Sequence, residues 1–83
     1  MTWEVQWEPM ALDEATGFLK DDPHGVDTLL QATDRLAEDP RPEGSRAWGT
    51  RHRRLHRGPW RILYRVDSEA RTLHIEHIGR TLD

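Results

Sequence analysis

Apolar and polar side chains alternate in the first short stretch of the chain, residues 3–7. An alternation of period two is typical of a half-buried strand, so we expect its apolar members, Trp3, Val5 and Trp7, to share one face. Pro9 follows and should end the strand, because proline has no amide hydrogen to donate to a neighbouring strand. The first element is therefore expected to be a short strand with one buried face.

Helical spacing follows the alternation, with apolar residues three or four positions apart. It predicts one helix from Met10 to Lys20 and a second from Pro23 to about Glu38. Asp22 should cap the second helix, because its carboxylate can accept hydrogen bonds from free amides of the first turn. The short connection predicts an antiparallel helical hairpin. Its expected apolar positions are Met10, Ala11, Leu12, Ala15, Phe18 and Leu19 in the first helix and Val26, Leu29, Leu30, Thr33, Leu36 and Ala37 in the second.

The pattern from Ala47 onward is that of β-strands separated by turn residues. We expect strands over residues 47–56, 60–66 and 72–78. The predicted order is β-α-α-β-β-β, an α+β fold in which the two-helix antiparallel hairpin packs on one face of a mostly antiparallel four-stranded sheet. Residues 1–83 should form a single domain whose other sheet face is open.

Positive charge gathers on the first two of these later strands. Residues 51–66 hold six arginines and two histidines and no carboxylate. Successive side chains of a strand point to opposite faces, so a buried Leu55 would place its even-numbered neighbours on the open face, and Arg61 would lie beside them on the next strand. The open-face set is His52, Arg54, His56 and Arg61, and the remainder, Arg51, Arg53 and Arg57, is expected at the rim.

Charge is also uneven along the whole chain, although its net value is only −3. Residues 1–40 carry ten acidic and two basic side chains, a net charge of −8, whereas residues 41–83 carry ten basic and five acidic ones, a net charge of +5. Ordinary scatter of surface charge produces some imbalance of this kind. An asymmetry between halves nevertheless favours a polyanionic partner.

Arginine and histidine together on a sheet face suit the cleavage of RNA, whose 2′-hydroxyl can attack the adjacent phosphate. Guanidinium groups match the phosphate oxygens, and histidine transfers protons near neutral pH. From the residue types alone, a basic face that binds an acidic protein without chemistry is an equal alternative. Trp48 and Trp60 are expected in the core or at its rim, although an exposed tryptophan beside arginines can stack on a base.

Composition also limits which metal sites, disulfides and cellular locations can be expected. The chain has no cysteine, so neither a disulfide framework nor a thiolate metal site can form. His74 and His77 lie in a predicted strand, where their spacing does not bring two ligands together, so we expect no metal and no cofactor. No apolar run approaches the ~20 residues that cross a bilayer, and no signal-peptide core is present, so we expect a cytoplasmic protein without a membrane partner.

Two segments resemble the RelE/ParE superfamily of toxins from bacterial type II toxin–antitoxin pairs: LHRGPWRILYRV at residues 55–66 and LHIEHIGR at residues 73–80. They are similar to the family pattern of leucine, a basic residue, glycine, an aromatic residue, arginine, two aliphatic residues and tyrosine, followed by an apolar strand that ends in glycine and a basic residue. The resemblance covers nearly the whole chain and includes the predicted element order.

The resemblance implies an mRNA interferase, a ribosome-dependent mRNA endonuclease that inhibits translation by metal-independent cleavage through the 2′-hydroxyl. Its partners would be the ribosome, mRNA and a cognate antitoxin, with which it could form a hetero-oligomer on operator DNA. Carried over by position, the catalytic residues would be Arg54, His56, Arg61, Arg80 and His52, and the RNA-binding residues would be Arg51, Arg53, Arg57, Arg65 and His77.

Two other functions stay open beside this one. A ParE-like inhibitor of DNA gyrase would bind a protein and perform no nuclease chemistry. A weakly toxic or inactive member would act mainly in a repressor complex with its antitoxin. The presence of Arg54 and Arg61 favours the RelE branch. The antitoxin is expected to be an acidic, partly disordered chain whose helix or strand covers the sheet.

Overall fold

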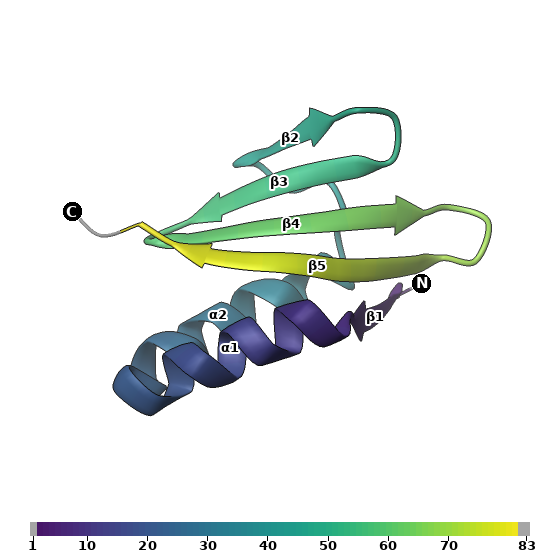
Figure 1. Cartoon of the computed structure of the whole chain (residues 1–83). Helices are drawn as coiled ribbons and strands as arrows, with labels where there is room; N and C mark the ends of the chain where they lie inside the picture. Colours follow the sequence, from purple (N-terminus) through teal and green to yellow (C-terminus); the bar gives the residue numbers. More distant parts are fainter. Residues whose placement is uncertain (1, 82–83) are drawn as a thin grey trace.

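The computed structural model describes residues 2–81 and contains a five-stranded sheet with two helices on one of its faces (Figure 1). The elements are β1 (Glu4–Trp7), α1 (Pro9–Asp21), α2 (Pro23–Leu36), β2 (Ser45–Trp48), β3 (His52–Arg57), β4 (Trp60–Asp67) and β5 (Thr72–Arg80). The strands lie side by side in the order β1-β5-β4-β3-β2. β1 pairs in parallel with β5, and every other pair is antiparallel. The predicted α+β class and helical hairpin are confirmed.

The sheet has one strand more than the sequence predicted, because residues 45–57 form the hairpin of β2 and β3 instead of one strand. Gly49 starts the turn at a φ of +78°, a conformation that glycine adopts without a steric penalty. The turn returns the chain so that Trp48 pairs with His52, and Ser45 pairs with Leu55. The single strand predicted over residues 47–56 was therefore wrong.

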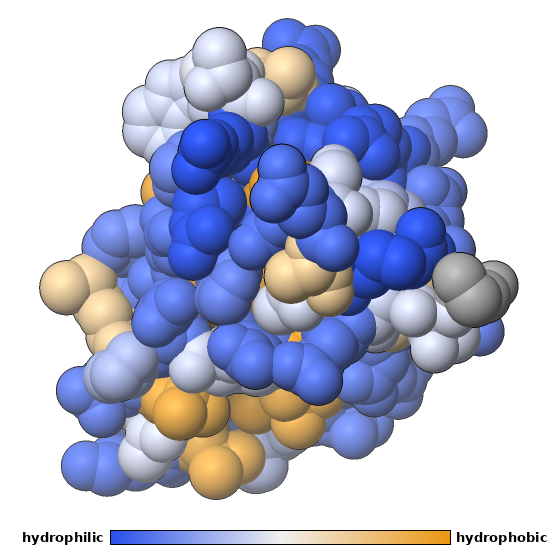
Figure 2. Space-filling view, turned by 90° about the vertical axis from the view of Figure 1, so that its right-hand side faces the viewer, coloured by the Kyte–Doolittle hydropathy of each residue, from blue (hydrophilic) through white to orange (hydrophobic). Residues whose placement is uncertain are grey.

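The helical hairpin begins and turns as the sequence predicted. The Asp22 carboxylate accepts a hydrogen bond from the Gly25 amide at 2.9 Å, which confirms it as the cap of α2. α2 ends at Leu36, two residues before the predicted end at Glu38. Four of the predicted apolar positions are exposed instead of buried: Met10, Leu12 and Leu19 on α1 and Leu30 on α2. In Figure 2, apolar side chains gather on the lower, helical side of the molecule, below a mostly hydrophilic strand side.

The core lies between the helices and the facing side of the sheet. Leu55 is fully buried, as predicted, and Trp60 meets Phe18 of α1 edge to face, with ring centres 5.2 Å apart. The buried Tyr64 hydroxyl donates a hydrogen bond to the Pro40 carbonyl at 2.6 Å, which fastens the α2–β2 connection to the sheet. Burial raises the pKa of Tyr64 above 10.0, and Ser45 and Arg53 partly offset that rise.

None of the helices within residues 2–81 is long and apolar enough to cross a membrane.

Candidate functional site

The open face of the sheet is built on the pairing of β3 with β4. Its register sets His56 opposite Arg61, Arg54 opposite Leu63 and His52 opposite Arg65. Leu55 of β3 and the intervening residues of β4, such as Ile62, are buried in the core. Strand alternation therefore puts the predicted open-face side chains on the side away from the helices.

Two adjacent hollows lie on this face. The first, of about 570 Å³, is lined by Gly44, Arg46, Ala47, Trp48, Arg54, His56 and Arg61. The second, of about 330 Å³, is lined by Glu14, Trp48, Arg54, Arg61, Ile62, Leu63, His77, Ile78 and Gly79. Both hollows share Arg54 and Arg61, and each adds one histidine. We call Arg54, Arg61, His56 and His77 the central cluster.

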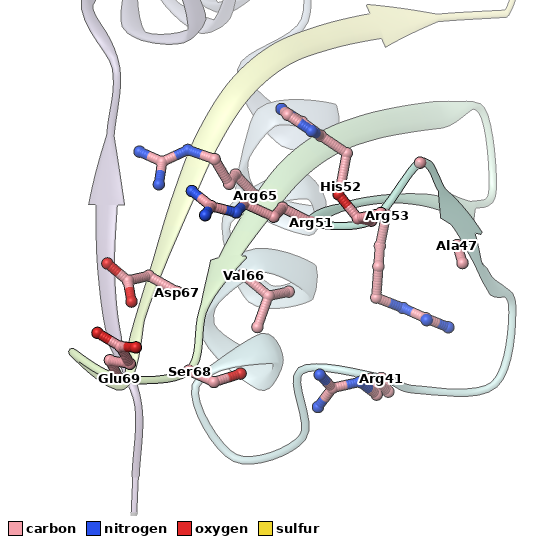
Figure 3. A pocket seen from close by; sticks show the side chains of 12 residues that line it. Arg41, Ala47, Arg51, His52, Arg53, Arg65, Val66, Asp67, Ser68 and Glu69 are labelled. Carbon is pink, nitrogen blue, oxygen red and sulfur yellow. The ribbon is translucent and has the colours of Figure 1, made fainter.

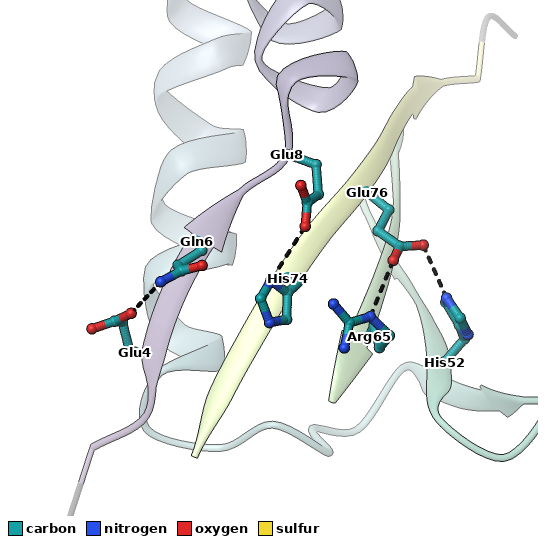
Figure 4. A network of polar contacts seen from close by, with 7 residues as sticks. All are labelled: Glu4, Gln6, Glu8, His52, Arg65, His74 and Glu76. Atoms are coloured by element: carbon teal, nitrogen blue, oxygen red, sulfur yellow. Dashed lines mark hydrogen bonds and ion pairs between the residues drawn. The ribbon is translucent and has the colours of Figure 1, made fainter. Parts of the chain in front are cut away.

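A carboxylate lies beside this cluster. Glu76 of β5 contacts His52 Nε2 through Oε1 at 2.9 Å and accepts a hydrogen bond from Arg65 Nε on Oε2 at 3.4 Å (Figure 4). All three side chains are partly exposed. His52 and Arg65 thus already have an anionic partner, which reduces the net positive charge at their end of the face.

A register shift between β4 and β5, at Leu63/Tyr64, explains how Glu76 and His77 both reach the open side. A bulge sets two consecutive residues opposite one, so strict alternation is interrupted there. Before the shift, Ile75 is buried, and after it, Ile78 is buried. The alternation of Leu73 and Ile75 was a signal for Glu76 on the open face, whereas the position of His77 depends on the bulge.

Two of the predicted rim arginines, Arg51 and Arg53, line a third hollow, of about 410 Å³, at the end of the sheet where the β2–β3 and β4–β5 turns lie (Figure 3). Arg51 points the same way as Arg65, whereas Arg53 points away from them. Arg53 donates hydrogen bonds to the Ser45 hydroxyl from Nη2 at 2.9 Å and from Nε at 3.2 Å. Asp67 and Glu69 also line the hollow, so its charge is mixed.

Arg80 is not part of the central cluster. It pairs with Trp60, so its side chain lies on the helical side of the sheet. Its guanidinium carbon is 4.8 Å from the Phe18 ring centre, and Nη1 donates a hydrogen bond to Asp22 at 3.3 Å. Arg80 was expected among the catalytic residues from its place in the family pattern, but aromatic packing and an ion pair hold it against the helices, away from Arg54 and Arg61. Arg57 is exposed at the end of the β3–β4 hairpin.

Two residues of this site were missed or misplaced from the sequence, and both belong to β2. Arg46 pairs with Arg54 and lines the first hollow. Trp48 lines both hollows and is 54% exposed, although a core or rim position was expected. Their charge and aromatic character were visible in the sequence, but only the β2–β3 turn returns them to the open face.

The two histidines of β5 lie near separate carboxylates. His74 Nδ1 lies 3.2 Å from Glu8, and His77 Nδ1 lies 3.7 Å from Glu14. Within the described part of the chain, no three histidine, aspartate or glutamate side chains gather as metal ligands. The groups that the site offers to a ligand are thus guanidinium, imidazole and indole.

The sequence of the chain matches one known protein family. The family model for the ParE toxin of the type II toxin–antitoxin system parDE matches residues 6–83. No curated protein sequence matches the chain.

Solved structures share the fold at low sequence identity. The RelBE2 toxin–antitoxin complex of Mycobacterium tuberculosis matches with a TM-score of 0.83 and 19% identity, over 96% of this chain and 99% of that chain. The isolated RelE toxin of E. coli matches with a TM-score of 0.79 and 18% identity, over 98% and 86%. The YoeB/ParE toxin of Agrobacterium tumefaciens matches with a TM-score of 0.78 and 13% identity, over 95% and 99%. The chain belongs to the ParE toxin family, within the RelE/ParE superfamily of type II toxin–antitoxin toxins.

Proposed function

We propose that this toxin is an mRNA interferase, a ribosome-dependent mRNA endonuclease that inhibits translation. One observation carries the proposal: Arg54 and Arg61 line two adjacent hollows on the open face, and each hollow contains one histidine of the central cluster. Neighbouring strands of a sheet are about 4.8 Å apart, so side chains in adjacent register positions can reach one phosphodiester group.

The central cluster supplies the groups that metal-free RNA cleavage needs. The 2′-hydroxyl loses its proton, its oxygen bonds to the adjacent phosphorus, and the bond to the 5′-oxygen breaks as that oxygen gains a proton. Arg54 and Arg61 stabilise the negative charge that builds on the phosphate oxygens. His56, opposite Arg61, takes the proton, and His77, opposite Leu63, supplies one to the leaving oxygen.

The other basic residues have supporting or structural roles in this proposal. Arg51 and Arg57 bind flanking phosphates and fix the path of the RNA without touching the reacting atoms, and Arg65 would join them only on release from Glu76. His52 is held by Glu76, and Arg80 is held against the helices, so neither is assigned to the proton transfers. Arg53 supports the β2–β3 hairpin through Ser45.

Transcript mapping after inducible expression in bacteria tests the proposal. Cuts inside translated codons are expected with the wild-type chain. Arg61→Ala should reduce their frequency on the order of 100- to 1,000-fold, because it removes a preorganised charge from the transition state. Arg35→Ala, which removes an exposed arginine from the last turn of α2, should leave cleavage unchanged and serves as the matched control. Wild-type cells that arrest without any cut mRNA would overturn the nuclease proposal.

A second candidate function is inhibition of DNA gyrase, and the match to the ParE toxin model favours it. The same expression experiment distinguishes the two: growth arrest with intact mRNA and damaged DNA would support gyrase inhibition. A chain without any effect on growth would instead point to a role confined to a repressor complex with the antitoxin on operator DNA.

The proposed partner in the resting cell is a cognate antitoxin. RelBE of E. coli and RelE–RelB of Pyrococcus horikoshii were solved as complexes of toxin and antitoxin. An acidic antitoxin segment that covers the open face would neutralise Arg54 and Arg61 and exclude RNA from both hollows.

A further inference from the structure

We propose that Trp48 is the stacking platform for one nucleobase of single-stranded RNA bound on the open face. This inference rests on the proposed RNA function and deepens it. It assigns a base-binding site to β2, which lies beside the central cluster and outside it.

The position of Trp48 is the first argument. Its side chain is 54% exposed at the edge of the sheet, although burial of an indole removes a large apolar area from water. Trp48 is paired with His52, so it lies on the open face with Arg54. The core does not use this side chain, whereas Trp60 is 1% exposed and fills the space above Phe18.

The contact with Arg54 is the second argument. The Arg54 guanidinium carbon lies 4.9 Å from the centre of the Trp48 ring. This cation–π contact fixes the indole directly beside a group that the proposed function assigns to a phosphate. A base stacked on the indole and the phosphate of the same strand would then be bound by neighbouring side chains.

The charge around Trp48 decides between a nucleic acid and a protein segment. Among residues 2–81, the first hollow is lined by three arginines, Arg46, Arg54 and Arg61, and by no carboxylate. The second adds one carboxylate, Glu14, and this side chain already accepts a hydrogen bond from the Ile78 amide at 2.9 Å. A flat aromatic group within strong positive charge fits a polyanion that carries flat rings, and every nucleobase has a stacking face.

Binding to a short 2′-O-methyl RNA tests the platform, because this RNA lacks the attacking hydroxyl and stays intact. Trp48→Ala should weaken binding by about 5- to 150-fold, the range that corresponds to loss of one stacked base. The slope of log affinity against log salt should stay unchanged, because the indole neutralises no phosphate. Trp48→Phe should restore most of the affinity. Leu30→Ala removes an exposed apolar side chain from α2 and should have no effect.

RNAs with a single abasic position provide the second measurement. One abasic position should weaken binding to the wild-type chain and leave binding to Trp48→Ala unchanged, because the variant has already lost the stacking partner. A general loss of structure in Trp48→Ala would weaken binding of every RNA equally and would lower the thermal stability of the variant. These two measurements therefore distinguish misfolding from the loss of one stacking partner.

The outcomes separate the platform from the proposed function. Salt-dependent RNA binding that is identical in the wild-type chain and Trp48→Ala would overturn the platform and leave the nuclease proposal standing. A wild-type chain that binds no RNA would overturn the platform, and transcript mapping decides the nuclease proposal separately. If Trp48→Ala binds RNA normally but loses affinity for an acidic peptide of alternating glutamate and leucine, Trp48 belongs to a protein interface and the inference is wrong.

Discussion

Glu76 gives the open face a negative group of its own. It holds His52 at 2.9 Å and Arg65 at 3.4 Å, so these two side chains are positioned but partly neutralised. The central cluster next to it lines two hollows, and within the described part of the chain Glu14 is the only carboxylate that lines them. Positive charge available to a phosphate is thus concentrated at Arg54 and Arg61, and Glu76 marks the boundary of that region.

Replacing Glu76 by glutamine should strengthen RNA binding. Glu76→Gln removes the negative charge and releases Arg65 for a phosphate. We expect a gain of up to roughly fivefold at low salt, because a partly exposed charge contact contributes at most about 1 kcal/mol. Binding to 2′-O-methyl RNA at several salt concentrations measures both the gain and a steeper salt dependence. Glu38→Gln, exposed after α2, is the control, and equal affinities of the two variants would contradict this role of Glu76.

The β2–β3 hairpin is the element that completes the site. It carries Arg46 and Trp48 on one strand and Arg54 and His56 on the other. The hairpin depends on a turn in which Gly49 has a φ of +78°. Because β2 lies at the edge of the sheet, its pairing with β3 is a local feature that can weaken without loss of the core.

Substitution of Gly49 tests this dependence. Gly49→Ala should destabilise the hairpin by about 1–2 kcal/mol, because a side chain is strained at this φ. An added Cβ would meet no atom within 4 Å, so the cost is that of the backbone alone. Hydrogen exchange should accelerate at the β2 amides and stay slow in β4 and β5.

Gly17→Ala is the matched control for that experiment. An added Cβ also meets nothing within 4 Å at Gly17, but this glycine lies inside α1. Alanine should therefore stabilise the chain by up to about 1 kcal/mol. If both substitutions changed stability in the same direction, the strain assigned to Gly49 would be contradicted.

Turns and bulges explain which parts of the molecule were predictable from the sequence. Residues 46, 48, 52, 54 and 56 all have the same parity, so a three-residue turn after Trp48 leaves the alternation unbroken. The pattern correctly predicted the faces of β3 and β4 but could not show that a second strand was present. Alternation alone could not place His77 on the open face either, because the shift at Leu63/Tyr64 interrupts the alternation there. Arg80 was misplaced because its aromatic and acidic partners come from distant elements.

The whole molecule has an acidic half and a basic half. Residues 1–40, which include both helices, carry a net charge of −8, and residues 41–83 carry +5. The helices lie against one face of the sheet, so the two signs are separated in space as well as along the chain (Figure 1). Such a charge distribution orients an approaching polyanion toward the strands before contact is made.

Salt titration of RNA binding tests this separation at the scale of the molecule. Five phosphate contacts, by Arg46, Arg51, Arg54, Arg57 and Arg61, predict a slope of about −3.5 for log affinity against log salt with single-stranded RNA. Arg54→Ala should make the slope shallower by about 0.7. Arg35→Ala on the helical side should leave it unchanged. A slope near zero for the wild-type chain would contradict a mechanism based on phosphate contacts.

The parallel pairing of β1 with β5 has a consequence for the synthesis of the toxin. Glu4–Trp7 finds its sheet partner only in residues 72–75, so a growing chain has no place for its first strand until β5 has been made. Leu73, Ile75 and Ile78 of β5 are also core residues, so the hydrophobic interior stays incomplete until then. Contacts between distant segments form late in folding. A nascent chain that has not reached β5 therefore cannot complete the sheet on which the central cluster is assembled.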